Sequence, residues 1–159
     1  MVGMTGHQGL PTPTAQLVTA ALRDTLRRYH PQLVGVSMLG PGADQLFARV
    51  VLDLGGWLYV VQPTKGMQYR DGFENPEAQR GYDELYGQAG YFEALEYTES
   101  TEVAHMEAGK VVVDRSGVLV AVWDGQPARG LGGTADVVAY ARERGVPVTV
   151  IWPEGASRD

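Results

Sequence analysis

Short apolar runs alternate with segments of helical periodicity along most of the chain. The apolar runs have the length of buried strands and lie at residues 2–6, 33–38, 57–61, 118–122 and 148–152. Apolar residues spaced three and four positions apart predict helices at 14–29, 43–54, 102–115 and 134–144. Alternating strands and helices are typical of βαβ units. The pattern therefore predicts an α/β fold: a Rossmann-like, mostly parallel sheet of about five strands with helices on both faces.

Residues 65–100 depart from this pattern, because they are polar, rich in Tyr and Glu, and only weakly periodic. We expect a loop at 65–75, a helix at 76–89 and a short helix or strand at 91–95. The segment is interpreted either as an insertion that covers a ligand like a lid or as a solvated excursion. Residues 154–159 are expected to be a frayed tail. The whole chain, 1–159, is predicted to be a single Rossmann-like nucleotide-binding domain.

Composition narrows the classes of partner. A chain of 159 residues is one domain by the usual length range. The net charge of -6 and the scarcity of basic clusters argue against a nucleic-acid-binding face, so no duplex DNA or RNA partner is expected. A small anionic ligand stays compatible with this charge, because backbone N–H groups and helix N-termini attract anions.

Several other site types are excluded by the residues present. The chain contains no cysteine, which excludes disulfides, thiolate nucleophiles and Cys-type zinc sites. His30 and His105 have no partners at metal-ligand spacing, so neither a metal nor a cofactor is predicted. No apolar run approaches the roughly 20 residues of a membrane helix. The first ten residues lack the pattern of a signal peptide, so the expectation is a cytoplasmic protein with no membrane partner.

Three glycine-bearing loops follow three of the predicted strands. In a parallel sheet all three loops lie at the carboxyl edge, where open α/β sheets bind their ligands. These loops and their flanks supply the candidate ligand- and phosphate-binding residues Thr5, Gly6, His7, Gly40, Gly42, Asp44, Arg115, Asp124, Gly125, Gly132, Gly133 and Thr134.

Each candidate also has an ordinary structural interpretation. The Gly132–Thr134 segment suits a phosphate-binding loop before a helix, or a simple glycine-rich turn. His7 could contact phosphate or ribose, or lie on the surface without a role. Asp44 could bind a hydroxyl and Arg115 could clamp an anion, yet both also complement helix dipoles. Asp124 suits a ribose hydroxyl or a base edge, or a turn. No P-loop motif occurs.

The chain resembles the SLOG superfamily of Rossmann-like proteins, which includes the Lonely Guy (LOG) phosphoribohydrolases and the DNA-processing protein A group. The resemblance is carried in order along nearly the whole chain by Met4-Thr5-Gly6-His7, Gly40-Pro41-Gly42-Ala43-Asp44, Val113-Asp114-Arg115-Ser116, Val120-Ala121-Val122-Trp123-Asp124-Gly125 and Gly132-Gly133-Thr134-Ala135-Asp136. It implies a nucleotide ligand and an enzymatic relative that cleaves N-glycosidic bonds.

One departure from the LOG-like motif concerns catalysis. Aligned on Gly133 and Thr134, the catalytic glutamate of the Lonely Guy motif falls on Val137, and Asp136 is one residue out. One residue is about 100° around a helix, so Asp136 is expected to point elsewhere. The resemblance therefore supports nucleotide binding more than hydrolysis.

Two functions remain open at this point. The first is a sensor or binding module for a nucleotide or nucleotide-derived ligand. The second is an N-glycosidic bond hydrolase or transferase, such as a phosphoribohydrolase or nucleoside deoxyribosyltransferase, in which Asp83, Glu84 or Asp124 would act on the ribosyl centre. Whether the protein is an enzyme, and which residues would be catalytic, is left unknown. A homodimer is expected, because two-fold dimers are the commonest assemblies.

Overall fold

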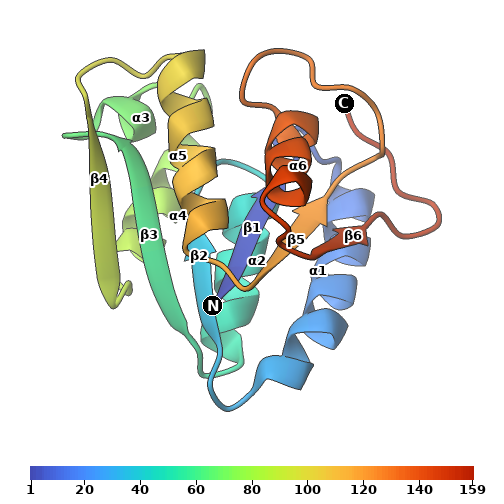
Figure 1. Cartoon of the computed structure of the whole chain (residues 1–159). Helices are drawn as coiled ribbons and strands as arrows, with labels where there is room; N and C mark the ends of the chain where they lie inside the picture. Colours follow the sequence, from blue (N-terminus) through green and yellow to red (C-terminus); the bar gives the residue numbers. More distant parts are fainter.

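All residues from 1 to 159 are described by the computed structural model, which contains one six-stranded sheet (Figure 1). The strands are β1 (Val2–Gly6), β2 (Val34–Ser37), β3 (Trp57–Thr64), β4 (Tyr91–Tyr97), β5 (Val118–Val122) and β6 (Val148–Ile151). Their order is β4-β3-β2-β1-β5-β6, and every pair of neighbours is parallel. The predicted α/β class and parallel sheet are confirmed.

Helices cover both faces of the sheet. They are α1 (Thr12–Leu26), α2 (Ala43–Asp53), α3 (Gln68–Asp71), α4 (Pro76–Tyr86), α5 (Glu102–Asp114) and α6 (Thr134–Glu143), with a 3-10 turn at Arg27–Tyr29. In Figure 1, α5 and α6 lie in front of the sheet. Side chains from α1, α2 and α4 form the larger hydrophobic core on the other face, and α5 and α6 form the smaller core. Burial of these apolar stripes is the main force that holds the layers together.

The position of β1 determines where a ligand site can form. The chain builds β2, β3 and β4 on one side of β1, then returns through α5 to place β5 and β6 on the other side. The loops after β1 and β5 therefore diverge to opposite sides at the carboxyl edge. Such a topological switch point leaves a crevice between the loops.

The sixth strand comes from the segment that the sequence marks as an insertion. Tyr91–Tyr97 pairs with β3, so this part of residues 65–100 is the edge strand of the sheet. Its alternation of exposed and half-buried residues follows from its place at the edge, and it weakens the apolar signal. β3 is longer than predicted and continues through Pro63, where the register with β4 shifts because proline has no N–H to donate.

None of the helices combines the length and apolar character that crossing a membrane requires.

Candidate ligand-binding site

A cavity of about 280 Å³ opens at the carboxyl edge of the sheet. Its lining combines the loop after β1, the loop between β5 and α6, the first turns of α2 and α6, and side chains from α3, α5 and the C-terminal segment. The candidates that line it are Thr5, Gly6, His7, Asp44, Gly132, Gly133 and Thr134. The candidates outside it are Gly40, Gly42, Arg115, Asp124 and Gly125.

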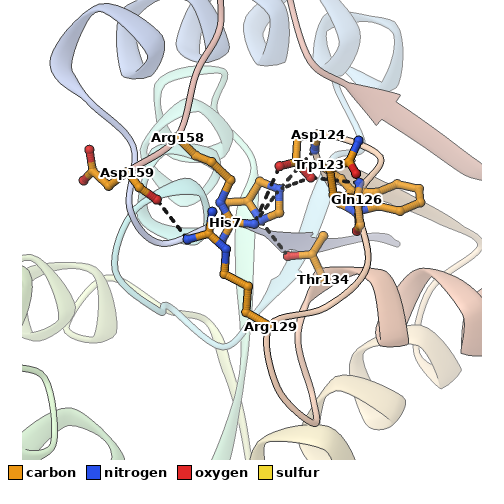
Figure 2. Close-up of polar contacts among 8 residues, drawn as sticks. All are labelled: His7, Trp123, Asp124, Gln126, Arg129, Thr134, Arg158 and Asp159. Atoms are coloured by element: carbon orange, nitrogen blue, oxygen red, sulfur yellow. Dashed lines mark hydrogen bonds and ion pairs between the residues drawn. The ribbon is translucent and has the colours of Figure 1, made fainter.

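His7 lies at the centre of the site and is only 5% exposed (Figure 2). The backbone N–H of Asp124 donates to His7 Nε2 at 3.0 Å. The other ring nitrogen, Nδ1, lies 3.4 Å from the Thr134 hydroxyl. Burial lowers the pKa of His7, and the nearby Arg158 guanidinium lowers it further, while Asp124 opposes both. Burial therefore favours the neutral ring, which lies beside the Thr134 hydroxyl at the edge of the cavity.

Asp124 stands behind His7 instead of facing a ligand. Its carboxylate lies 3.1 Å from His7 Nε2 and 3.8 Å from the Arg158 guanidinium, and it accepts from the Gln126 N–H. Burial alone would raise the pKa of Asp124, but the Gln126 N–H, His7 and Arg158 together lower it. Asp124 thus holds His7 and Arg158 in place from outside the cavity.

Two arginines that sequence reasoning missed enter the site. Arg129 and Arg158 both line the cavity. Arg158 Nε is buried without a hydrogen-bond partner, although the side chain also approaches His7 Nε2 at 3.5 Å. Arg129 donates to the backbone carbonyl of Asp159 at 2.9 Å. We call these two side chains, with the amino end of α6, the cationic wall.

The C-terminal segment is not a frayed tail, and that prediction was wrong. The Ser157 N–H donates to the Thr14 hydroxyl at 2.9 Å, and the Asp159 N–H donates to the Gly9 carbonyl at 3.0 Å. These bonds fold the segment back over the loop after β1, as Figure 2 shows for its last two residues. The segment thereby brings Arg158 to the cavity.

The amino end of α6 keeps two backbone donors free. The Gly132 N–H donates to the Asp136 carboxylate at 3.1 Å, and the Gly133 N–H donates to the Gly130 carbonyl at 3.3 Å. The N–H groups of Thr134 and Ala135 make no hydrogen bond. Both residues line the cavity, so the free donors of the helix start and the two arginines border the same space.

Asp136 and Val137 are placed as the comparison with the Lonely Guy motif predicts. Val137 lines the cavity at the position of that glutamate, whereas Asp136 does not line it and is bound to Gly132. Gly132 has a φ of +83°, a left-handed conformation that glycine adopts without strain. Gly133, by contrast, has a φ of -68° that any residue can adopt.

The second glycine loop has a structural role at Gly42. Its φ is +81°, and a Cβ built on it would lie 2.2 Å from the Gln8 carbonyl oxygen. The next residue, Ala43, donates its N–H to the His7 carbonyl at 3.1 Å. The loops after β1 and β2 are thus docked against each other, and no ligand fits between them at Gly42.

Arg115 is not brought to the cavity, and its proposed role as an anion clamp has no support in the geometry. It follows the last residue of α5 and precedes the start of β5, which places it at the amino edge of the sheet. There it makes a bidentate ion pair with Glu93, with distances of 3.0 and 2.8 Å. The pairing raises the pKa of Arg115 and lowers that of Glu93.

The carboxylates of residues 74–99 also lie outside the cavity. Asp83 forms an ion pair with Arg70, and Glu84 lies 3.7 Å from Arg49. No group of three His, Asp or Glu side chains is arranged to hold a metal ion.

On the far side of the switch point, three further side chains line the cavity, and we call them the polar wall. They are Asp44 from α2, Tyr69 from α3 and His105 from α5. The rings of Tyr69 and His105 meet edge to face at 5.2 Å. His105 Nε2 lies 2.7 Å from the Ser100 hydroxyl, and burial lowers the pKa of His105.

Several solved structures share this architecture. DNA processing protein A from Streptococcus pneumoniae is similar with a TM-score of 0.70 and 18% identity, over 97% of this chain and 50% of that one. The chain thus spans about half the length of that relative. DNA processing protein A from Helicobacter pylori, which has a unique single-stranded DNA binding mode, is similar with a TM-score of 0.69 and 16% identity, over 99% of this chain and 67% of that one. The chain has a SLOG-like Rossmann fold.

A third similar structure is more distant. The molybdenum cofactor binding protein from Rippkaea orientalis matches with a TM-score of 0.56 and 18% identity, over 94% of this chain and 74% of that one. No protein-family model and no curated protein sequence matches this chain. These identities show a shared fold alone.

The comparison corrects the prediction about partners. The exclusion of duplex DNA or RNA on the basis of net charge was wrong as a guide to nucleic-acid partners, because a protein of the same fold binds single-stranded DNA. Local arginines and helix N-termini can bind phosphate whatever the net charge of the domain. The expected homodimer is untested by a single chain and stays a prediction.

Proposed function

We propose that this domain binds a phosphate-bearing nucleotide or nucleotide-derived ligand and acts as a sensor or binding module. The observation that carries the proposal is the cationic wall: Arg129, Arg158 and the free N–H groups of Thr134 and Ala135 meet in one cavity at the switch point. An anion there would interact with both guanidinium groups and with the positive end of the α6 dipole.

The position of Arg158 supports an anionic ligand. Its side chain lines the cavity, and its one ion pair, with Asp124, is long at 3.8 Å. The Thr134 hydroxyl, which lies 3.4 Å from His7 Nδ1, adds a further polar group beside the helix end. Thr5 and Gly6 complete the surface from the loop after β1.

None of residues 74–99 lines the cavity. The enzymatic alternative needs a carboxylate such as Asp83 or Glu84 at the ribosyl centre, so their position favours binding over catalysis. One observation keeps N-glycosidic bond hydrolysis or transfer as a second candidate: Asp44 brings a carboxyl group to the cavity. Incubation with AMP and chromatographic detection of free adenine tests that candidate. Adenine release that Asp44→Asn abolishes would support it, and no release would remove it.

Calorimetric titration with inorganic phosphate, AMP and a short single-stranded oligodeoxynucleotide tests the proposed binding. Arg158→Gln should weaken the phosphate-bearing ligand that binds the wild type by about tenfold, or about 1.4 kcal/mol. The matched control is Arg28→Gln, which removes the same charge from an exposed residue outside the cavity and should leave the affinity unchanged. No binding of any of these probes to the wild type, or equal losses in both variants, would contradict the proposal.

A further inference from the structure

The two walls of the cavity lie on opposite sides of the switch point. The cationic wall follows β5 and β6, whereas Asp44, Tyr69 and His105 follow β2, β3 and β4. A ligand that fills the cavity therefore contacts two different sets of groups, and no arginine or lysine is paired with Asp44 of the polar wall.

Tyr69 has an unsatisfied hydroxyl in this wall. The residue is only 6% exposed, and its ring is fixed by edge-to-face contacts with Phe73 at 5.0 Å and His105 at 5.2 Å. Its hydroxyl makes no hydrogen bond with the protein, although buried tyrosine hydroxyls usually find a partner. The packing thus holds a donor at the cavity surface without giving it an acceptor.

Asp44 provides a second incompletely bonded group close by. Its Oδ2 accepts from the Gly40 N–H at 3.1 Å, while Oδ1 makes no hydrogen bond. A Cβ at Gly40 would lie 2.8 Å from the Tyr69 hydroxyl and 3.2 Å from Asp44 Oδ2, so glycine leaves room for both atoms. Burial raises the pKa of Asp44 to about 7, although the Gly40 N–H lowers it. Near neutral pH the carboxyl group can therefore donate as well as accept.

We infer that Asp44 and Tyr69, with His105 beside them, bind an uncharged part of the ligand that carries both hydrogen-bond donors and acceptors, while its phosphate lies on the cationic wall. This inference rests on the proposed function and specifies its ligand as a molecule of two parts. A ribose diol and the edge of a nucleobase share the required chemistry. Inorganic phosphate lacks it, which gives the inference a direct test.

The test compares inorganic phosphate, ribose 5-phosphate and AMP by calorimetric titration. Tyr69→Phe removes only the hydroxyl and keeps the ring contacts, and Asp44→Asn keeps an acceptor for the Gly40 N–H. Tyr29→Phe is the matched control, because Tyr29 packs outside the cavity against the large core. A thermal melt of each variant verifies that it is folded.

The expected result is a selective loss. Tyr69→Phe and Asp44→Asn should each weaken the organic phosphates about tenfold and change inorganic phosphate less than about twofold. Weakening of both organic probes assigns the wall to the ribose, and weakening of AMP alone assigns it to the base. Unchanged affinities, or equal losses for all probes, would overturn the inference and leave the anion site standing. If none of the three binds the wild type, the anion site fails and the polar wall fails with it.

Discussion

The two walls of the cavity are built on different principles. In the cationic wall the side chains are held by polar contacts: Arg158 approaches His7 and Asp124, and Arg129 donates to the Asp159 backbone. In the polar wall, Tyr69 and one oxygen of Asp44 have no partner, and the rings around them supply the rigidity. The first wall is therefore preorganised by polar contacts and the second by packing, which predicts different responses to substitution and to pH.

A substitution at Gly42, where the loops after β1 and β2 are docked against each other, should cause the largest loss of stability. Gly42→Ala places a Cβ 2.2 Å from the Gln8 carbonyl oxygen at a φ of +81°, so the loops after β1 and β2 must separate. We expect a loss of about 3 kcal/mol in the free energy of unfolding, measured by urea denaturation. Gly55→Ala is the control, since it has a similar φ of +77° and nothing within 4 Å, and it should cost about 1 kcal/mol. Equal losses would show that the loops are not docked closely at Gly42.

The polar wall should show the stronger pH dependence of stability. Because the pKa of Asp44 in the folded protein, about 7, exceeds its ordinary value of 3.8, the folded state binds more protons between these values. This contribution to stability is therefore fully present below the lower value and is lost as the pH rises through the higher one. Asp44→Asn should be more stable than the wild type by about 4 kcal/mol near pH 8, and the difference should vanish as the pH falls below about 4. A difference that does not vary with pH would contradict the burial of an ionisable carboxyl group here.

The cationic wall should be sensitive to bulk at the start of α6. In Gly133→Val the Cβ would lie 2.9 Å from that of Ala128, so the loop that carries Arg129 must shift. We expect about a tenfold weaker affinity for AMP, or about 1.4 kcal/mol, with the fold retained because the φ of -68° suits valine. Gly117→Val, at the amino edge of the sheet, is the control and should bind AMP normally. Normal binding by the Gly133 variant would place the phosphate elsewhere.

The smallest expected effect is a shift in the titration of His7. Its pKa should lie below the ordinary value of about 6.5, and an anion on the cationic wall should raise it because negative charge favours the protonated ring. Proton NMR of the imidazole signals, with and without AMP, measures both values. The folded-state pKa is depressed, so the contribution of His7 to stability should be lost as the pH falls from 6.5 through that pKa. If AMP leaves the pKa of His7 unchanged, the bound phosphate does not lie near His7.

Local sequence patterns predict most of the framework. The alternation of apolar runs and helical stripes predicts five of the six strands, and the glycine loops after β1 and β5 do meet at one cavity. The sequence also contains the reason why Arg115 is not in the cavity. A residue between the end of a helix and the start of a parallel strand lies at the amino edge of the sheet, opposite the ligand site. Arg129 could also be predicted from the sequence, because it is a cation within the glycine-rich loop before α6.

Other parts of the site leave no local signal. Arg158 reaches the cavity only because the segment after β6 folds back onto Gly9 and Thr14, far away in the sequence. Tyr69 is positioned by a short helix within a polar segment, and its importance comes from a missing partner that only the tertiary structure reveals. Contacts between residues distant in sequence depend on the path of the whole chain, which periodicity does not encode.

The central claim is that an anion binds at the amino end of α6 between Arg129 and Arg158. Titration of the ¹⁵N-labelled protein with AMP, followed through its backbone amide signals, tests this most directly. The account predicts that the largest shifts occur at the amides of Thr134 and Ala135, whose N–H groups are free, and that Arg158→Gln reduces these shifts at equal AMP concentration. Shifts confined to other parts of the chain, or none at saturating AMP, would contradict it.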